Sequence, residues 1–383
     1  MRTVRFGIIG CGLMGRELAS AAARWCHLPE MDMAPQLVGI CDTNAALFPW
    51  YQRNFPTVKL ATEEYQALLA DKDIELIYCA VPHNLHRQLY CDVISSGKSL
   101  LGEKPFGIDK PANDAIMTCI QGHPGAFVRC SSQFPFFPAV QRICDMIEGG
   151  AFGRLIEVST GFLHSSDLDP GKPINWKRIV ALNGEYGCMG DLGMHACHVP
   201  LRAGWVPRSV RAALCNIFAH RPDGKGGMAP CETWDNATLL CEAVDGATGE
   251  SFPWTIKTQR IAPGERNTWY IEILGTKASA RFSTRNANLL EVLEYTQGEE
   301  QTWQHVQMGQ QSAFKSITGG IFEFGFSDAI LQMFAAYLFE MAHGQPLKRF
   351  AGCVTPEETA WSHRLFTAAL ESQQNSTTVA VGE

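Results

Sequence analysis

The fold is decided by the stretch Phe6-Gly7-Ile8-Ile9-Gly10-Cys11-Gly12-Leu13-Met14-Gly15, close to the start of a chain of 383 residues. Residues 4–9 form a short apolar run that is rich in β-branched side chains, which predicts a strand. The alanine- and leucine-rich residues 16–25 predict a helix. The glycines between them follow the pattern Gly-x-Gly-x-x-Gly. A strand, a tight glycine turn and a helix in this order predict a βαβ unit that holds a dinucleotide pyrophosphate at the helix N-terminus.

An acidic residue follows the next predicted strand, as such a site requires. The apolar residues 37–41 end at Asp42, which lies farther from the glycine loop than is usual, and we interpret residues 26–35 as an insertion that adds the length. A carboxylate at this position accepts hydrogen bonds from both ribose hydroxyls and repels a 2′-phosphate. Asp42 therefore favours NAD over NADP. The alternative is a structural βαβ turn that binds no ligand.

Short apolar strands continue to alternate with amphipathic helices up to about residue 130. This alternation predicts parallel βαβ units and hence a doubly wound parallel sheet. We expect further strands over residues 76–81, 99–101 and 126–130, and helices over residues 63–70, 86–95 and 110–121.

Beyond residue 130 the pattern changes. A helix is expected over residues 138–148, and helices return over residues 321–342 and 355–373. A run of longer strands without intervening helices predicts a large, mostly antiparallel, open sheet in an α+β domain. We therefore expect two domains, an NAD-binding domain over residues 1–130 and a substrate-binding and oligomerisation domain over residues 131–383. The strands are expected over residues 156–161, 210–218, 237–243, 255–258, 270–274, 278–282 and 289–295.

Composition narrows the classes of function. Apolar residues make up 46% of the chain and charged residues 19%, as in an ordinary globular protein. The net charge of −7 argues against nucleic acid or an anionic membrane as the partner. No apolar run approaches the roughly 20 residues that cross a bilayer, and the first residues lack the layout of a signal peptide. We expect a cytoplasmic protein whose 14 scattered cysteines are reduced packing residues.

Two polar segments follow predicted parallel strands, at the sheet edge where such folds bind ligands. Leu101-Gly102-Glu103-Lys104-Pro105 ends the strand over residues 99–101, and the proline restricts the backbone of Lys104. Val81-Pro82-His83-Asn84-Leu85-His86 follows the strand before it. His86 is expected either to cap the next helix or to line the cofactor cleft.

A third polar segment lies in the second domain, at Gly187-Cys188-Met189-Gly190-Asp191-Leu192-Gly193-Met194-His195-Ala196-Cys197-His198. If this segment is helical, then Asp191, His195 and His198 project from one face. A carboxylate beside a histidine supports general acid and base chemistry near neutral pH. The same three residues form a ligand set for a divalent metal, or they are buried polar groups with satisfied partners.

Read together, these segments resemble the Gfo/Idh/MocA family of glucose-fructose oxidoreductase, inositol dehydrogenase and rhizopine-catabolism proteins. The shared order is the glycine loop, Val-Pro-x-x-x-His, Gly-Lys-x-x-x-x-Glu-Lys-Pro and Gly-Asp-x-Gly-x-His. Residues 134–155 also look like the family's first segment of the second domain. The resemblance covers residues 4–205 by motif and the later strand-rich region by pattern only.

The resemblance implies an NAD(P)-dependent enzyme that oxidises a sugar, polyol or glycoside hydroxyl, or reduces the matching ketone. It places Lys104, Asp191 and His195 in the catalytic site. His195 is expected to take the hydroxyl proton as hydride leaves the same carbon, and Lys104 to hydrogen-bond the substrate oxygen. Asp191 is expected to orient the sugar and the histidine. The resemblance also implies a cis bond between Lys104 and Pro105.

The remaining site residues are assigned to cofactor and substrate, and no metal ion is assigned. Trp176 is expected either to stack on a sugar face or to pack in the core of the second domain. The cofactor residues are expected to be Gly10, Gly12, Leu13, Met14, Gly15, Asp42, Pro82, His83, His86, Glu103 and Lys104. The substrate residues are expected to be Lys104, Trp176, Lys177, Asp191, His195 and His198.

Two positions depart from the family pattern. The family commonly has an aspartate where this chain has His198, and a polar-basic pair where it has Ser132-Gln133. Both differences bear on the substrate rather than on the reaction. A free-sugar or inositol dehydrogenase and a glycoside 3-dehydrogenase remain alternatives.

Other classes of protein and the assembly state complete the expectations. A metal-dependent hydrolase or lyase would use Asp191, His195 and His198 as ligands, and a non-catalytic sensor would bind NAD and a partner protein. A sensor does not need Lys104 and His195, so the presence of both residues counts against this alternative. An open sheet face in the second domain predicts a homodimer or homotetramer formed through that sheet.

Overall fold

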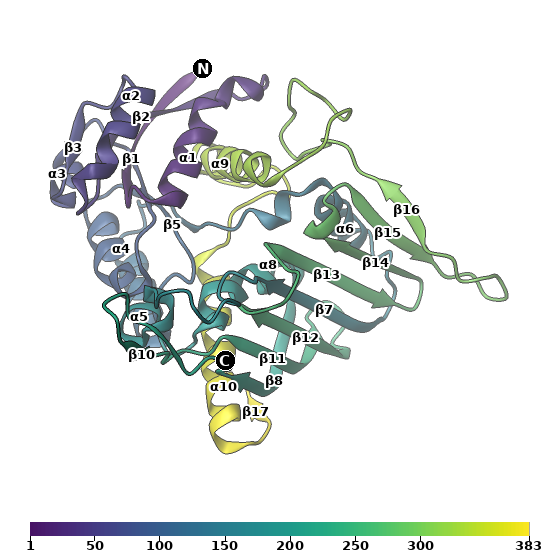
Figure 1. The fold of residues 1–383 in the computed structure, drawn as a ribbon. Coiled ribbons are helices and arrows are strands. Elements are labelled where there is room, and N and C mark those ends of the chain that lie inside the picture. Colours follow the sequence, from purple (N-terminus) through teal and green to yellow (C-terminus); the bar gives the residue numbers. More distant parts are fainter. Residues whose placement is uncertain (383) are drawn as a thin grey trace. The chain divides into compact units, whose positions relative to one another are not determined.

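The computed structural model describes residues 1–382, which form two compact units (Figure 1). Unit 1 contains residues 1–107, 111–136 and 310–356, and unit 2 contains residues 108–110, 137–309 and the chain from residue 357 onward. The expected domains, residues 1–130 and 131–383, do not describe this division. The chain returns to unit 1 at residue 310, because the long apolar helix that follows completes the core of that unit.

The core of unit 1 is a sheet of six parallel strands in the order β3-β2-β1-β4-β5-β6. This is the strand order of a doubly wound dinucleotide-binding fold, which confirms the predicted fold class of the first part of the chain. The short strand β3 was not among the expected strands. The strands are β1 (Arg2–Ile9), β2 (Met33–Cys41), β3 (Leu60–Thr62), β4 (Leu76–Cys79), β5 (Ser99–Gly102) and β6 (Val128–Cys130).

Helices cover this sheet, and one of them comes from the far end of the chain. Helix α9 packs against α1, and its Phe334 ring meets Phe6 and Trp25 edge-on, at centroid distances of 5.4 and 5.6 Å. Arg24, which caps the C-terminus of α1, adds an ion pair of 2.5 Å with Asp328 of α9. The helices are α1 (Leu13–Ala23), α2 (Phe48–Asn54), α3 (Tyr65–Ala70), α4 (His86–Ser95), α5 (Lys110–Gly122) and α9 (Phe326–His343).

Unit 2 is built on a nine-stranded sheet in the order β16-β15-β14-β13-β7-β12-β11-β8-β17. Neighbouring strands are antiparallel except for β7 and β12, which confirms the predicted mostly antiparallel sheet. The strands are β7 (Leu155–Leu163), β8 (Trp205–Cys215), β11 (Asn236–Asp245), β12 (Ser251–Gln259), β13 (Thr268–Gly275), β14 (Ala278–Ser283), β15 (Leu289–Glu294), β16 (Gln304–Gln307) and β17 (Val379–Ala380). A separate two-stranded sheet contains β9 (His220–Pro222) and β10 (Met228–Pro230).

One face of the large sheet is covered and the other carries exposed side chains. Helix α8 packs on β7, β8, β12 and β13. On β11 the burial alternates, with Leu239 and Cys241 buried and Leu240 53% exposed, so Leu240 lies on the uncovered face. The helices of this unit are α6 (Pro138–Glu148), α7 (Val180–Asn183), α8 (Met194–Ala203) and α10 (Pro356–Asn375).

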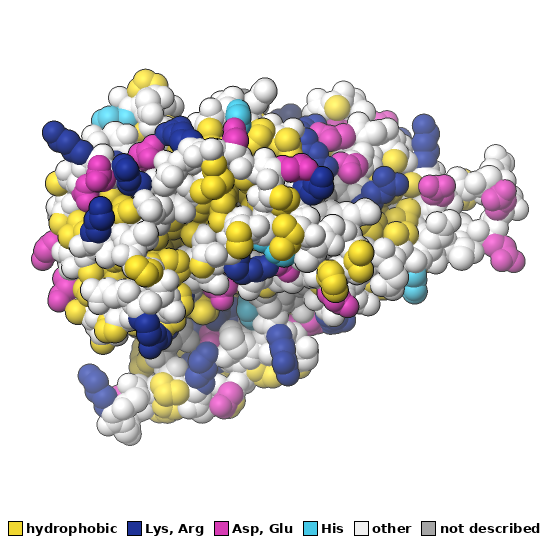
Figure 2. Space-filling model, turned by 90° about the horizontal axis from the view of Figure 1, so that it is seen from above, with side chains coloured by type: hydrophobic (Ala, Val, Ile, Leu, Met, Phe, Trp, Pro, Cys, Tyr) yellow, Lys and Arg dark blue, Asp and Glu magenta, His cyan; other side chains and the backbone are white. Residues whose placement is uncertain are grey.

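The surface carries mixed charge. On the face shown in Figure 2, acidic and basic side chains are interspersed rather than gathered by sign. Across residues 1–382, no helix is both long enough and apolar enough to cross a membrane.

Candidate functional site

The glycine loop between β1 and α1 has the close contacts that its glycines permit. Gly10 has a φ of +98°, and a Cβ there would lie 2.3 Å from the carbonyl oxygen of Ala80. A Cβ on Gly15 would lie 2.2 Å from the carbonyl oxygen of Gly10. Both contacts are far inside van der Waals distance, so any side chain would force the loop and helix α1 away from the sheet.

The same loop leaves room over the N-terminus of α1. A Cβ on Gly12 would meet no atom within 4 Å, and no side chain caps this helix end. The first turn of α1 contains no acidic residue that would occupy the helix N-terminus or repel an anion. The loop therefore fits a pyrophosphate, which would rest on the backbone N–H groups of this turn.

Asp42 lies beside this loop. Its Oδ2 accepts a hydrogen bond from the Cys11 N–H at 2.7 Å, and its Oδ1 accepts one from the Asn44 N–H at 2.8 Å. The extra residues 26–35 contain most of a 3-10 turn (Trp25–His27) and the first three residues of the nine-residue strand β2. Each carboxylate oxygen retains a further lone pair, as needed to accept a ribose hydroxyl.

His86 joins two loops at the same sheet edge. Its Nδ1 accepts a hydrogen bond from the Gly107 N–H at 3.3 Å, so Nε2 carries the proton that it donates to the Val81 carbonyl at 3.1 Å. The ring also stacks on Tyr90 at 4.6 Å. These bonds give His86 a structural role between the loops after β4 and β5. Its contact with cofactor stays a prediction, as do those of Pro82 and the buried His83.

Glu103 is buried at the end of β5 and is anchored by hydroxyl groups. Its Oε1 accepts hydrogen bonds from Tyr78 at 2.7 Å and Ser131 at 2.6 Å, and its backbone carbonyl accepts one from Tyr90 at 2.8 Å. The next peptide bond, between Lys104 and Pro105, is cis, as the resemblance implied. Glu103 therefore fixes the end of β5, from which the half-buried Lys104 projects.

In unit 2, the segment that carries the other predicted residues is helical but irregular. Residues Met189–Gly193 form a π-helical turn that leads directly into α8. Such turns are rare and are frequently found at functional sites. Asp191 lies in this turn, and His195 and His198 follow in α8, so the structure confirms that the segment is helical.

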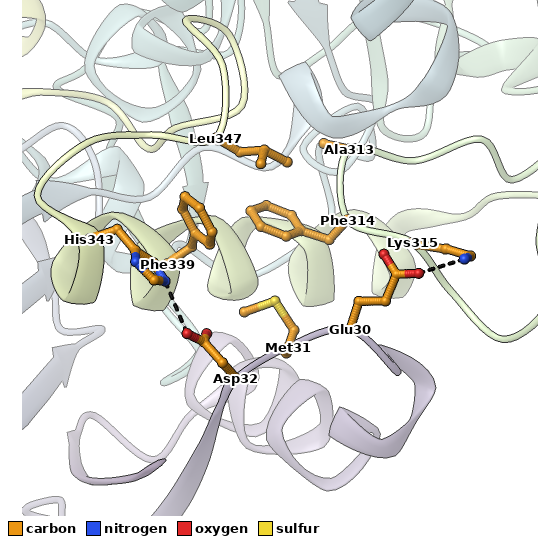
Figure 3. A pocket seen from close by; sticks show the side chains of 9 residues that line it. All are labelled: Glu30, Met31, Asp32, Ala313, Phe314, Lys315, Phe339, His343 and Leu347. Carbon is orange, nitrogen blue, oxygen red and sulfur yellow. Dashed lines mark hydrogen bonds and ion pairs between the residues drawn. The ribbon is translucent and has the colours of Figure 1, made fainter. Parts of the chain in front are cut away.

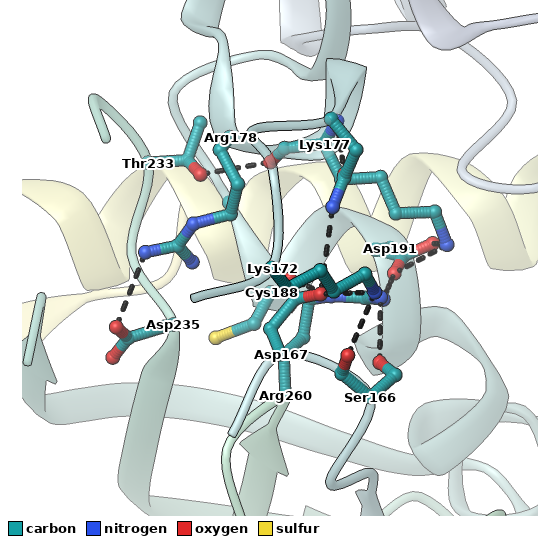
Figure 4. Close-up of polar contacts among 12 residues, drawn as sticks. Ser166, Asp167, Lys172, Lys177, Arg178, Cys188, Asp191, Thr233, Asp235 and Arg260 are labelled. Atoms are coloured by element: carbon teal, nitrogen blue, oxygen red, sulfur yellow. Dashed lines mark hydrogen bonds and ion pairs between the residues drawn. The ribbon is translucent and has the colours of Figure 1, made fainter. Parts of the chain in front are cut away.

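Asp191 is buried between two cations (Figure 4). The Lys177 Nζ lies 3.0 Å from each of its carboxylate oxygens. The Arg260 Nη1 donates to Asp191 Oδ2 from another direction. The carboxylate is therefore held as an anion whose direction is fixed.

Arg260 extends this arrangement to a second buried carboxylate. Its Nε donates to Asp167 Oδ2 at 3.1 Å and its Nη2 to the Ser166 hydroxyl at 2.9 Å, while the Lys172 Nζ lies 2.9 Å from Asp167 Oδ1. Burial by itself would raise the pKa of Asp167, but Arg260 and Lys172 outweigh it and the pKa is lowered. Burial would lower the pKa of Arg260, but Asp191 and Asp167 raise it. We call the series Lys172–Asp167–Arg260–Asp191–Lys177 the charge chain.

His195 is held by aromatic residues of the sheet. The Trp269 indole N–H donates to the backbone carbonyl of His195 at 2.8 Å. The Phe162 ring packs edge-on against the His195 ring at 5.5 Å. The histidine is 4% exposed. The Phe162 ring therefore lies against the His195 ring, and the bond from Trp269 holds the backbone of His195.

His198 lies against other groups. Its Nε2 is 3.8 Å from Glu358 Oε2, and Glu358 is in turn held by Arg202 at 2.6 and 2.7 Å. Burial lowers the pKa of His198 well below its ordinary value, and Arg202 and His195 lower it further. His198 is thus a buried neutral ring beside an ion pair, which favours its interpretation as a buried polar group rather than as a residue that binds substrate.

Trp176 precedes Lys177 in a short turn capped by Asn175, whose side chain accepts the Lys177 N–H at 3.0 Å. The Lys177 Nζ lies 5.5 Å from the centre of the Trp176 ring. The Trp176 ring therefore lies beside the Lys177 end of the charge chain. Trp176 is half-buried, so part of this side chain is accessible.

The metal alternative finds no support in the structure. Among residues 1–382, no group of three His, Cys, Asp or Glu side chains is arranged to hold a metal ion. Asp191 contacts cations through both oxygens, and His198 is directed to Glu358. Asp191, His195 and His198 therefore do not form the ligand set that their spacing permitted.

Sequence reasoning missed Arg260, Asp167 and Lys172 of the charge chain, and also Tyr78 and Ser131, which hold Glu103. Tyr78 carried a weak signal, because it is a polar tip in an otherwise apolar buried strand. Arg260 and Asp167 lie after the ends of β12 and β7, which pair side by side, so their proximity follows only from the strand order.

Unit 1 also contains a cavity that is lined by a separate set of residues. It has a volume of about 320 Å³ and an apolar centre of Met31, Phe314, Phe339 and Leu347 (Figure 3). Two ion pairs flank it, Lys315 with Glu30 at 2.5 Å and His343 with Asp32 at 3.2 Å. None of the predicted site residues lines it.

Comparisons with known proteins agree with this architecture. A family model described as "Oxidoreductase family, NAD-binding Rossmann fold" matches residues 4–121, and the "GFO/IDH/MocA C-terminal domain" matches residues 140–281. Levoglucosan dehydrogenase of Pseudarthrobacter phenanthrenivorans is 24% identical over 311 residues, which cover 76% of this chain and 76% of that protein. Trans-1,2-dihydrobenzene-1,2-diol dehydrogenase of Mus musculus is 26% identical over 288 residues, covering 71% of this chain and 81% of that protein.

Solved structures show the same fold along the whole chain. Levoglucosan dehydrogenase in complex with NADH and L-sorbose matches with a TM-score of 0.88 at 21% identity, over 100% of both chains. The fold, the glycine loop and the family models define an oxidoreductase with an NAD-binding Rossmann domain. The chain belongs to the Gfo/Idh/MocA family, and the two models together match more than half of it.

Proposed function

We propose that this protein is an NAD-dependent dehydrogenase that acts on a CH–OH group of a sugar, polyol or glycoside. The observation that carries the proposal is the ion pair between the half-buried Lys177 and the buried Asp191, which lies on a π-helical turn that leads into His195. Oxidation of an alcohol needs a base for the hydroxyl proton and fixed polar groups for the neighbouring oxygens. This segment supplies both.

The residues act in defined roles. NAD, held by the glycine loop and Asp42, would supply the acceptor for the hydride of the carbon that bears the hydroxyl. His195 takes the hydroxyl proton, so that the alcohol loses one hydride and one proton and becomes a ketone. Lys104 hydrogen-bonds the same oxygen and stabilises the negative charge that develops on it. Asp191 keeps the Lys177 ammonium in place for the substrate's other polar groups.

Cofactor choice is proposed to rest on Asp42. Its carboxylate is fixed by the Cys11 and Asn44 N–H groups, so it cannot turn away from a ligand without losing both bonds. A 2′-phosphate placed against a fixed carboxylate costs like-charge repulsion, whereas two ribose hydroxyls gain hydrogen bonds. We therefore propose NAD as the preferred cofactor.

Relatives support a carbohydrate-like substrate. Levoglucosan dehydrogenase and dTDP-3,4-didehydro-2,6-dideoxy-alpha-D-glucose 3-reductase, named for sugar substrates, are 24% and 26% identical to this chain. A half-buried Trp176 ring beside polar groups suits the apolar face and the hydroxyls of a sugar. We also propose a homodimer or homotetramer in the cytoplasm, formed through the uncovered sheet face that carries Leu240.

The test is an assay of inositols, hexoses and glycosides with NAD and with NADP, followed at the absorbance band of the reduced nicotinamide. The proposal expects at least one of these substrates to reduce NAD, and His195→Asn and Lys104→Met to lower kcat by about 10²–10⁴-fold. Full turnover in both variants would contradict the catalytic roles. Tight NAD binding without turnover of any substrate would favour the non-catalytic sensor.

A further inference from the structure

Two cysteines lie together on neighbouring helices of unit 1. Of the 14 cysteines, all of which are free thiols, most are buried, whereas Cys91 in α4 and Cys119 in α5 are half-buried. Small molecules in solution reach a half-buried thiol more easily than a buried one. Helix α4 joins β4 to β5 and α5 joins β5 to β6, so the two helices lie on the same face of the parallel sheet.

Each of the two sulfur atoms reaches the backbone of the other helix. Cys119 Sγ lies 3.6 Å from the carbonyl oxygen of Cys91. Cys91 Sγ lies 4.0 Å from the carbonyl oxygen of Ala115, which is one helical turn before Cys119. The two side chains therefore share the space between the helices, where their thiol groups interact with each other.

Cys119 has two hydrogen-bond donors beside its sulfur. His123 Nδ1 lies 2.9 Å from the Cys119 carbonyl oxygen, so this nitrogen carries a proton, because a carbonyl only accepts. The same nitrogen is 3.9 Å from Cys119 Sγ, and the Ser95 hydroxyl oxygen is 3.7 Å from it. Both groups can donate to the sulfur when it is a thiolate, which is the form that attacks a disulfide. Cys119 is therefore suited to react first.

Cys91 is suited to react second. Burial raises the pKa of its thiol to about 12, and the charge and the hydrogen bond of Cys119 contribute to this rise. Cys91 is therefore protonated near neutral pH as long as Cys119 is unmodified. A Cys119 sulfur that is bonded to another sulfur carries no charge, so its contribution to the raised pKa of Cys91 then disappears.

We propose that Cys91 and Cys119 form a reversible disulfide, with glutathione disulfide as the oxidant. Cys119 attacks one sulfur of the oxidant, whose sulfur–sulfur bond breaks, and one glutathione leaves as a thiolate. Cys91 then attacks the Cys119 sulfur of the mixed disulfide, and the second glutathione leaves. The two cysteines lose two electrons and two protons in total, and the oxidant gains them as two glutathione thiols. This reaction is independent of the proposed dehydrogenase activity.

The disulfide would join the two helices that hold the loop after β5. His86, at the start of α4, accepts a hydrogen bond from the Gly107 N–H at 3.3 Å, and Asn113 of α5 donates one to the Phe106 carbonyl at 2.9 Å. The same loop carries Lys104. Oxidation would therefore fix to each other the two helices on which this loop rests.

The experiment treats the folded, full-length protein with increasing glutathione disulfide until the exposed Cys26 is modified. Remaining thiols are then blocked with N-ethylmaleimide, and the peptides are mapped by mass spectrometry. The proposal expects a pair of peptides linked through Cys91 and Cys119 as the main disulfide within the chain. Treatment with dithiothreitol is expected to return both cysteines to thiols.

Three variants test the order of the steps, with a fourth as control. Cys91→Ser is expected to stop the reaction at glutathione bound to Cys119, and Cys119→Ser to leave Cys91 without glutathione. His123→Leu is expected to slow the loss of the Cys119 thiol by about 3–10-fold, because a donor to the thiolate is removed. Cys215→Ser removes another exposed cysteine and should form the disulfide at the wild-type rate.

The wild-type protein alone decides whether the pair forms, so a variant that fails to fold does not obscure the result. Glutathione on Cys26 without a link between Cys91 and Cys119 would overturn the proposal, because the oxidant would have reached the protein and left the pair unjoined. Glutathione on Cys91 in Cys119→Ser, together with an unmodified Cys119 in Cys91→Ser, would overturn the assigned order.

Discussion

The guanidinium of Arg260 bridges the buried carboxylate of Asp191 to that of Asp167. A carboxylate that receives both a guanidinium and an ammonium is a poor base, because taking up a proton would break both ion pairs. Asp191 is therefore an orienting group, and the task of proton transfer is left to His195. The predictions below follow from this division of roles and from the geometry around it.

Arg260→Met is expected to destabilise the protein by about 3–5 kcal/mol, because it leaves two buried carboxylates without their shared partner. Arg260→Lys keeps the charge but lacks the planar guanidinium that reaches both carboxylates. Its stability is therefore expected to lie between that of the wild type and that of Arg260→Met. Urea unfolding measures the change. The exposed Arg266→Met serves as the control and should shift stability by less than about 0.5 kcal/mol. Equal stability of Arg260→Met and wild type would contradict the bridging role.

Stability is expected to fall below about pH 6.5 because of His198. Its folded-state pKa is lowered by burial, Arg202 and His195, so in this range the unfolded chain binds a proton that the folded chain does not. Stability from this group is therefore complete above the ordinary histidine pKa and is lost as the pH falls toward the folded value, by up to about 1.4 kcal/mol per pH unit. The facing carboxylate of Glu358 opposes this effect.

The measurement is thermal or urea unfolding between pH 5 and 7.5 of the wild type, His198→Gln and His220→Gln. His198→Gln should flatten the loss of stability at low pH, whereas the exposed His220→Gln should follow the wild type. A wild-type profile that rises toward pH 5, or one that His198→Gln leaves unchanged, would show that His198 is not a buried neutral group.

Asp42→Ala is expected to raise KM for NAD by about 10–100-fold, because two hydrogen bonds to the ribose are lost. The substitution also removes the carboxylate that repels a 2′-phosphate. The ratio of kcat/KM with NAD to kcat/KM with NADP should therefore fall by more than the rise in KM for NAD accounts for. Steady-state kinetics with both cofactors measure this. The exposed Asp73→Asn is a matched control in the same unit. A wild-type enzyme that prefers NADP would refute the role given to Asp42.

Much of the fold was predictable from sequence, for reasons that differ between the units. In unit 1 each strand and helix has a local signal, and the loop Gly10 to Gly15 specifies how they join. The return of α9 was not predictable, because an apolar helix such as Phe326–His343 does not reveal which core it completes. Its contact with Phe6 and Trp25 spans most of the chain.

The site was predictable where function lies in short motifs and not where it depends on strand pairing. Lys104, Asp191 and His195 lie in segments that resemble family motifs, whereas Arg260 and Asp167 are brought together only because β7 and β12 pair in parallel. For His198, a local sequence pattern was not sufficient. Helical spacing predicted that it shares a face with Asp191, but a π-helical turn changes the angular position of each residue, and the Nε2 of His198 lies 3.8 Å from Glu358 of α10.

The central claim, hydride transfer from a substrate carbon to NAD with His195 as the base, is tested most directly by isotope transfer. A sugar, polyol or glycoside that reduces NAD is prepared with deuterium on the carbon that bears the reacting hydroxyl, and the reduced cofactor is analysed by mass spectrometry. The account predicts one deuterium in each reduced nicotinamide, and loss of this product in His195→Asn. Reduced cofactor without deuterium, or undiminished labelling in His195→Asn, would contradict it.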